Sequence, residues 1–218
     1  MNAPVHLREV RDVTGTVPQS LRSDARENRD RVLDAARILF SERGIDVTMR
    51  AIARRAGVGP ATLYRRFPTK QDLVDEAFAH ELQACRAIVE DGCADDDPWR
   101  GFCSVIERIS VLNASNQGFV DAFMADRPDA VAFRVHRESL LKSLAGLARR
   151  AKATGGLRRD FVIDDLVLVL MAGRGLSSTR PADRVVAARR FAALAVEAFR
   201  ASDTNGRLPR RAAPLGSR

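Results

Sequence analysis

The stretch of sequence that decides the fold is Thr48–Lys70, which reads TMRAIARRAGVGPATLYRRFPTK. Its first residue is a favourable N-cap, and the apolar residues that follow recur three or four positions apart, which predicts a short amphipathic helix. Gly57 can adopt the left-handed conformation that ends such a helix. Gly59 and Pro60 can begin another helix, which must end before Pro68. The stretch therefore predicts two short helices that are joined by a tight turn.

The second of these helices is amphipathic in a way that leaves its polar side chains free. Leu63 and Phe67 are four positions apart, so they share the face that packs against the preceding helices. Thr62, Arg65 and Arg66 lie on the other faces. Two short helices joined by a glycine-containing turn form the helix-turn-helix, whose second helix enters the major groove of DNA. The pattern favours a DNA-binding motif.

Positive charge is concentrated around this motif. The chain has 218 residues and a formal net charge of +8. Residues 22–70 contain twelve Lys or Arg and six Asp or Glu, whereas residues 71–202 contain 18 positive and 19 negative side chains. This asymmetry favours a module that binds a polyanion and is joined to a neutral body. A well-solvated basic surface would give the same distribution, so charge alone does not decide between the two interpretations.

The same stretch resembles the DNA-binding signature of the TetR family of bacterial repressors. The most distinctive part is T-L-Y at 62–64 followed by F-P-x-K at 67–70. A helix of suitable length is predicted before it, over residues 24–43, with Asp24 and Glu27 as a capping pair. The resemblance covers about residues 24–90 and implies that the helix-turn-helix binds DNA.

The resemblance implies DNA contacts for nine residues, some to phosphates and some to base edges. The phosphate-contacting residues are Thr48, Tyr64, Arg66 and Lys70, and the base-contacting residues are Arg50, Pro60, Ala61, Thr62 and Arg65, of which Arg65 could serve either purpose. Gly59 departs from the family pattern, which often has serine or threonine at this position. Tyr64 could instead be a buried packing ring, and we expect Arg54 and Arg55 to form a solvated face.

The rest of the chain shows helical periodicity and no alternating strand pattern. Further helices are predicted from Thr69 to near Gly92, over 98–115, over 119–126, from Asp126 to Gly155, over 166–172 and over 181–201. With the resemblance, this predicts an all-α fold: an N-terminal three-helix helix-turn-helix domain followed by a C-terminal helical ligand-binding and dimerisation bundle. The expected domains are a mobile N-terminal arm (1–23), the DNA-binding domain (24–68), the effector-binding and dimerisation domain (69–202) and a mobile basic tail (203–218).

The resemblance also implies an effector pocket and a dimer interface in the C-terminal bundle. The candidate pocket residues are Cys85, Phe102, Ile106, Phe119, Phe123, Leu144, Leu168 and Met171. The candidate dimer residues are Leu166, Leu170, Val186, Arg190, Phe191 and Leu194. Either set could instead complete the monomer's core. His136 and Asn113 are polar candidates that could orient a ligand, or surface residues.

Motifs for other functions are missing from the sequence. Cys85, Cys93 and Cys103 match no zinc or redox spacing, and the three histidines are far apart. The chain has no phosphate-binding glycine loop, nucleophile elbow or paired carboxylates, so we expect neither an enzyme nor a metal or cofactor. The longest apolar run, 166–172, is too short for a membrane span, and the first 25 residues lack an apolar signal sequence. We therefore expect a cytoplasmic protein.

The sequence thus predicts a homodimeric, sequence-specific DNA-binding transcriptional regulator. We expect it to repress transcription from a palindromic double-stranded DNA operator until a small, mostly apolar effector shifts it to a conformation whose two reading helices no longer match successive grooves. One alternative is a structural protein that binds DNA nonspecifically and has no effector. Another is a helical enzyme or small-molecule carrier in which the N-terminal helices merely pack.

Overall fold

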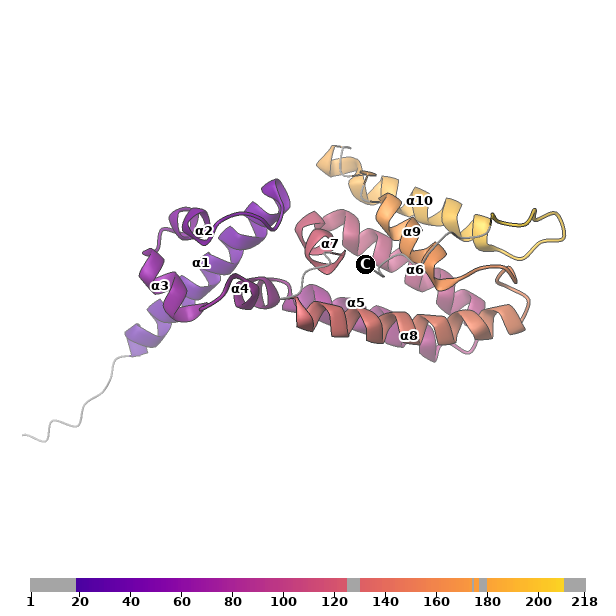
Figure 1. Ribbon diagram of the computed structural model, residues 1–218, viewed down its shortest axis with the longest axis horizontal. Helices are drawn as coiled ribbons and strands as arrows, with labels where there is room; N and C mark the ends of the chain where they lie inside the picture. Colours follow the sequence, from indigo (N-terminus) through magenta and orange to yellow (C-terminus); the bar gives the residue numbers. More distant parts are fainter. Residues whose placement is uncertain (1–18, 125–129, 174, 177–179, 210–218) are drawn as a thin grey trace, which may run out of the picture.

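The computed structural model describes residues 19–124, 130–173, 175–176 and 180–209, and every element named within these ranges is helical. The predicted all-α fold is therefore confirmed. The helices form two lobes along the long axis of the molecule (Figure 1). A small N-terminal lobe holds the helix-turn-helix, and the larger lobe, which we call the body, contains the later helices. Within the described ranges, no helix is long and apolar enough to span a bilayer.

The N-terminal lobe is built from α1 (Gln19–Arg43), α2 (Met49–Ala56) and α3 (Pro60–Arg66). The Thr48 hydroxyl accepts a hydrogen bond from the Ala51 N–H at 3.2 Å, which caps α2 as the sequence predicts. Gly57 ends α2 with φ +67°, a left-handed conformation that favours glycine. The buried residues of this lobe come from all three helices, and they include Val32, Leu33, Ala36, Leu39, Phe40, Ile52, Leu63 and Phe67.

The first helix is longer than the sequence predicts. It begins at Gln19, directly after Pro18, and not at Asp24. The expected capping pair of Asp24 and Glu27 therefore lies inside the helix. The residues between Pro18 and Asp24 include no glycine or proline, so nothing in this segment prevents the helix from starting earlier.

The predicted helix from Thr69 to Gly92 is two helices. The structure has α4 (Lys70–Ala77), with the predicted Thr69–Asp72 capping box, and α5 (Ala79–Ala94), with a break at Phe78 where φ is −111° and ψ is 12°. Arg37 of α1 donates from Nε to the Ala77 carbonyl at 2.8 Å, so this oxygen is occupied by a side chain at the break. The Phe78 ring is fully buried between the lobes. Tertiary contacts therefore interrupt a pattern that is locally continuous.

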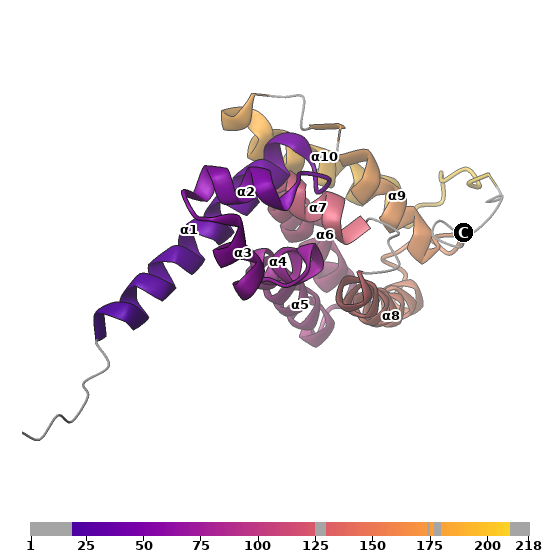
Figure 2. The same ribbon diagram turned by 60° about the vertical axis from the view of Figure 1, so that its left-hand side comes forward.

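The body is arranged around α6 (Pro98–Ser115), which packs against α5 and α8 (Val131–Ala153) on one side and α10 (Arg184–Phe199) on another (Figure 2). Between the lobes lies α7 (Gln117–Met124), and α9 (Ile163–Gly173) lies beside α10. The Asp97 carboxylate caps α6 by accepting from the Trp99 and Arg100 N–H groups. The last predicted helix starts with a short 3-10 helix, η2 (Pro181–Asp183). The expected start of α8 at residues 126–129 lies outside the described residues.

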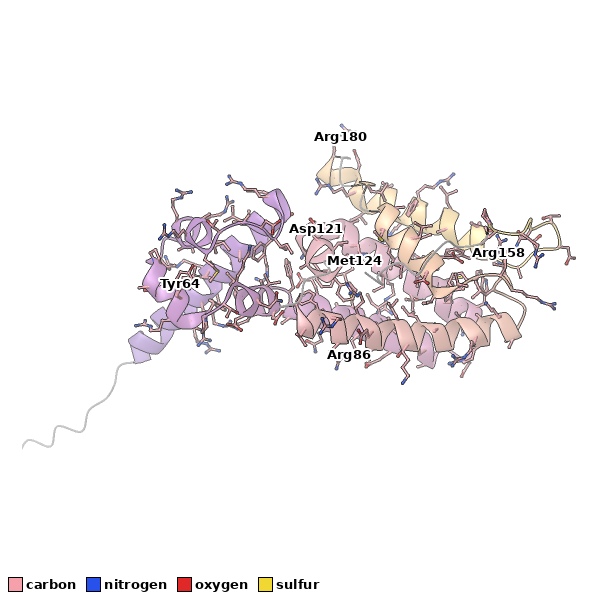
Figure 3. The ribbon with its side chains drawn as sticks, viewed as in Figure 1. Tyr64, Arg86, Asp121, Met124, Arg158 and Arg180 are labelled. Atoms are coloured by element: carbon pink, nitrogen blue, oxygen red, sulfur yellow. The ribbon has the colours of Figure 1, made fainter. Side chains whose placement is uncertain are left out.

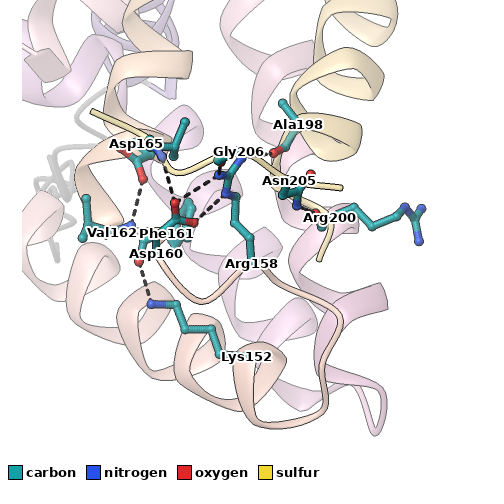
Figure 4. Close-up of polar contacts among 11 residues, drawn as sticks. Lys152, Arg158, Asp160, Phe161, Val162, Asp165, Ala198, Arg200, Asn205 and Gly206 are labelled. Atoms are coloured by element: carbon teal, nitrogen blue, oxygen red, sulfur yellow. Dashed lines mark hydrogen bonds and ion pairs between the residues drawn. The ribbon is translucent and has the colours of Figure 1, made fainter. Parts of the chain in front are cut away.

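The chain folds back onto the body at the end distant from the N-terminal lobe (Figure 4). Arg158 is buried and donates to both carboxylate oxygens of Asp160 and to the carbonyls of Ala198 and Gly206. The Leu208 N–H in turn donates to Asp160 at 3.0 Å. Residues 203–209, where the sequence predicts a mobile tail, are thus held by a buried guanidinium.

Candidate DNA-binding surface and effector cavity

One face of α3 is apolar and buried, and its other faces expose polar side chains. Leu63 and Phe67 are each 1% exposed, so they fix the helix to the lobe. Tyr64 is 47% exposed and lies on the DNA-binding lobe far from the body (Figure 3). Thr62, Arg65 and Arg66 are also exposed. The structure therefore does not place Tyr64 in the core, and the exposed residues form one face that can meet a ligand.

The start of α3 is open. Gly59 occupies the N-cap position in an extended conformation and provides no side-chain cap. A side chain here would have room, because an added Cβ would meet only the Thr62 Oγ1, at 3.9 Å. Pro60 and Ala61 are exposed in the first turn. Pro60 has no N–H, and the Thr62 and Leu63 N–H groups donate to the Gly59 carbonyl, so the Ala61 N–H is the first-turn donor left for an acceptor such as a phosphate oxygen.

The remaining predicted DNA contacts lie at the edges of the same lobe. Arg50 is exposed in the first turn of α2, and Thr48 is exposed directly before it, although its hydroxyl also caps α2. Lys70 is half-buried and has a partner within the chain. Arg54 is exposed, and Arg55 forms an ion pair with Glu42 at 3.6 Å. Of the nine predicted DNA contacts, eight are exposed and only Lys70 is half-buried.

An apolar cavity of about 60 Å³ lies inside the body, between α5, α6, α7, α8 and α9. Five of the predicted pocket residues line it, namely Cys85, Ile106, Phe119, Phe123 and Leu144. Burial, and secondarily the nearby Glu81 carboxylate, raises the pKa of the Cys85 thiol to about 12, so this thiol is a neutral part of the wall. A second cavity of about 380 Å³ lies next to it toward α10 and shares Asn113, Val120 and Leu170 as a common wall.

Three predicted pocket residues lie elsewhere. Phe102 packs among Trp99, Phe161 and Phe199 at the distal end of the body. Leu168 is 56% exposed and Met171 is 38% exposed, because α9 turns the face with Leu166 and Val167 inward and these two residues outward. The sequence could not predict which face of α9 is buried, because this segment is apolar all round.

Sequence reasoning missed Arg137, which is the one charged residue among the described residues that line the apolar cavity. It precedes Leu140, Leu141 and Leu144, which also line the cavity, by three, four and seven positions on α8. This helical spacing was the signal available for finding it.

The predicted dimer residues divide between surface and interior. Val186 is 70% exposed and Leu194 is 57% exposed on α10, and Arg190 is exposed between them. Phe191 is half-buried. Leu166 is 1% exposed, so it belongs to the core of the monomer and cannot contribute to an interface, and Leu170 lines both cavities. The large apolar side chains that α9 and α10 leave exposed are Leu168, Met171, Val186 and Leu194.

Comparisons with known proteins identify the family. The model of the bacterial regulatory proteins of the tetR family matches residues 32–77. An HTH-type transcriptional regulator of Staphylococcus aureus strain USA300 is 46% identical over 63 residues, which are 28% of this chain and 34% of the relative. The match thus spans about a third of the length of the curated relatives. The crystal structure of the TetR regulator SCO0520 from Streptomyces coelicolor is 30% identical, with a TM-score of 0.50, over 80% of this chain and 99% of that chain.

The chain belongs to the TetR family of transcriptional regulators. Two more distant structures share its fold. The TetR-family regulator PfmR from Thermus thermophilus is 21% identical, with a TM-score of 0.62, over 77% of this chain and 98% of that chain. The ketosteroid regulator KstR2 of Mycobacterium tuberculosis is 20% identical, with a TM-score of 0.62, over 80% and 95% of the two chains. In this TetR-family chain the matched residues 32–77 contain α2, α3 and α4, so the family signature coincides with the DNA-binding lobe.

Proposed function

We propose that this TetR-family regulator acts in the cytoplasm as a homodimeric repressor that binds a palindromic operator and is released by a small effector. Residues 24–68 bind DNA and residues 69–202 bind the effector and dimerise. The observation that carries the proposal is the exposed polar face of α3 above the buried Leu63 and Phe67. A helix of this length is unstable alone, so its rigid seat on α1 and α2 is what allows its outward groups to read a groove.

The proposed DNA contacts are those that the family resemblance implies, and the exposure of most of these side chains supports them. Tyr64 and Arg66, together with Thr48 and Lys70, hold phosphates, whereas Arg50, Pro60, Ala61, Thr62 and Arg65 approach base edges. Among the described residues, neither Arg65 nor Arg66 forms an ion pair, so both guanidinium groups are available to DNA. Phosphate contacts orient the protein, and base contacts provide the sequence preference.

Dimerisation through α9 and α10 gives the regulator two reading helices. One short helix reads too few base pairs to select a site in a genome, and a twofold dimer doubles the site. The large apolar side chains that α9 and α10 leave exposed, namely Leu168, Met171, Val186 and Leu194, support this interface. Exposed apolar surface of this kind is typical of a protein–protein contact.

A chain of aromatic rings connects the apolar cavity with the DNA-binding lobe. Phe119 and Phe123 line the cavity, with their ring centroids 5.4 Å apart. Phe119 also contacts Phe78 at the α4–α5 break, and Phe78 contacts Phe40 of α1, at 5.8 Å in each case. The backbones of α7 and α1 are in close contact too, since a Cβ on Gly118 would lie 2.8 Å from the Phe40 carbonyl carbon. An effector that moves α7 would therefore displace α1 and α4.

A gel-shift experiment with the DNA upstream of the regulator's own gene tests the proposal. We expect a discrete complex with the wild-type protein, and weaker binding at moderate salt for Tyr64→Phe and Arg66→Ala without a lower melting temperature. Arg54→Ala removes an exposed cation from the solvated face of α2 and is the matched control. Equal affinity in all four proteins would contradict the assigned contacts. Binding that falls steeply with salt and shows no sequence preference would favour the nonspecific structural protein.

A further inference from the structure

The apolar cavity has walls that are almost uniform in chemistry. Among the described residues that line it, only Asn113 and Arg137 have side chains that form ordinary hydrogen bonds. The others are aliphatic or aromatic, or are sulfur-containing groups such as the neutral Cys85 thiol. A guanidinium beside so many apolar groups is the feature of this cavity that most needs a chemical explanation, because a cation near a low-dielectric interior favours a negative partner.

The Arg137 guanidinium has only one partner in the described part of the chain. Its Nη1 donates to the Phe123 carbonyl at 2.9 Å, and no carboxylate among the described residues pairs with it. A guanidinium has five N–H groups, so most of its donors remain available. Four other arginines of the body are paired with acids: Arg100 with Asp95, Arg108 with Asp91, Arg158 with Asp160 and Arg200 with Glu197.

The surroundings of Arg137 add positive charge. Burial and the nearby Arg86 guanidinium lower the pKa of His136, the residue before Arg137, so Arg86 acts on the same part of α8. Figure 3 shows Arg86 beside α8. Glu81 does not line the cavity and already accepts a hydrogen bond from Asn116 at 2.6 Å. In the part of the chain that the structure describes, the charged group that lines the cavity is therefore a cation.

We infer that the effector is an amphipathic anion, whose apolar part fills the cavity and whose carboxylate or phosphate pairs with Arg137. This inference rests on the proposed effector response and names the chemical class of the ligand. The planar guanidinium fork can bind either oxyanion through two parallel hydrogen bonds.

The same pairing explains how an effector bound in the cavity would move α7. The Phe123 carbonyl that Arg137 holds belongs to the last turn of α7. An anion that draws the guanidinium away breaks this link, while the apolar chain pushes on the Phe119 and Phe123 rings. Both effects act on the helix that contacts Phe78 and α1.

Calorimetric titration of the full-length protein tests the inference with three probes of equal chain length: octanoate, octyl phosphate and octan-1-ol. We expect at least one of the two anions to bind the wild-type protein about tenfold or more tightly than the alcohol, and the stronger anion identifies the headgroup. Arg137→Gln should abolish the preference for anions and leave binding of the alcohol unchanged. Arg134→Gln, the same charge change at an exposed site one turn earlier on α8, should retain the preference.

Three results would overturn the inference: equal affinity for octan-1-ol and both anions, an unchanged preference in Arg137→Gln, or no binding of any probe to the wild-type protein. If Arg137→Gln does not fold, Arg137→Lys keeps the charge without the planar fork and should show a reduced but measurable preference. Gel shifts without ligand are measured in parallel. If the wild-type protein binds DNA but shows no preference for anions, only the inferred class of ligand is refuted. If the wild-type protein shows no sequence-specific DNA binding, the proposed function is refuted.

Discussion

The proposed binding site of the N-terminal lobe lies on its surface, whereas that of the body lies inside its core. In the DNA-binding lobe, α3 buries Leu63 and Phe67 and exposes its polar side chains, so the binding surface and the core use different residues. In the body, the cavity that we assign to the effector is lined mainly by core residues, and the Arg137 guanidinium is the one charged group among its described lining residues. We therefore expect DNA affinity to change without a change in stability when the α3 side chains are replaced, whereas replacements in the cavity should change ligand binding and stability together.

The largest effect is expected on α3. Replacing both Arg65 and Arg66 with alanine should weaken operator binding about a hundredfold, because each such contact contributes about 1–3 kcal/mol. The melting temperature should not fall, since both side chains are exposed. Titrations at several salt concentrations should also show a smaller salt dependence, by about one unit of slope for each lost phosphate contact. A clear loss of thermal stability would mean that Arg65 and Arg66 also stabilise the fold of this lobe, which would contradict the account.

A smaller effect, on stability, is expected at the distal end of the body. Arg158→Ala removes a buried guanidinium that holds Asp160 and the carbonyls of Ala198 and Gly206, and it should lower the free energy of unfolding by about 2 kcal/mol. Chemical denaturation measures this change. At a temperature where the variant is folded, its DNA affinity should equal that of the wild type. A lower DNA affinity would contradict the claim that this end of the body does not affect DNA binding.

The Asp160 carboxylate should make part of this stability depend on pH. The Arg158 guanidinium, and next the Leu208 N–H, hold the pKa of Asp160 well below its usual range. The contribution is therefore present above the unfolded pKa, near pH 4, and is lost as the pH falls below it. Because Asp160 is partly exposed, the effect should be about 1 kcal/mol or less. Denaturation between pH 3 and 6 should show a weaker acid-dependent loss for Asp160→Asn, and parallel curves for both proteins would refute the assignment.

The smallest effect is expected at the start of α3. Gly59→Ser adds an N-cap hydroxyl at a position with open space and should raise the free energy of unfolding by a few tenths of a kcal/mol. Thermal unfolding measures this gain, with Gly57→Ser as the contrasting variant, because φ at Gly57 is +67° and a side chain there is strained. Destabilisation by Gly59→Ser would show that the start of α3 is tighter than the structure indicates.

The sequence predicted the DNA-binding lobe well because its signals are local. The Thr48 cap, the Gly57 turn and the four-residue spacing of Leu63 and Phe67 each depend on neighbours in the chain, and the structure contains all three. The start of α1 was wrong because a favourable capping pair does not prevent a helix from beginning earlier.

The body was harder to predict because its decisive contacts are distant in sequence. The break at Phe78 depends on Arg37, forty residues from the carbonyl that it binds. The orientation of α9 could not be derived from a segment that is apolar on every side, so Leu168 and Met171 were assigned inward and Leu166 outward. Arg137 was overlooked because an arginine on a helix is usually solvated, and only the packed structure shows that it lines a cavity.

Selection of bound fragments from random double-stranded DNA tests the central claim most directly. If two copies of α3 read successive major grooves, the recovered sequences should contain two inverted half-sites with centres about one helical turn, or 34 Å, apart. Arg65→Ala should relax the preference at one position in each half-site. Recovery of fragments without a common sequence, despite tight binding, would contradict the account.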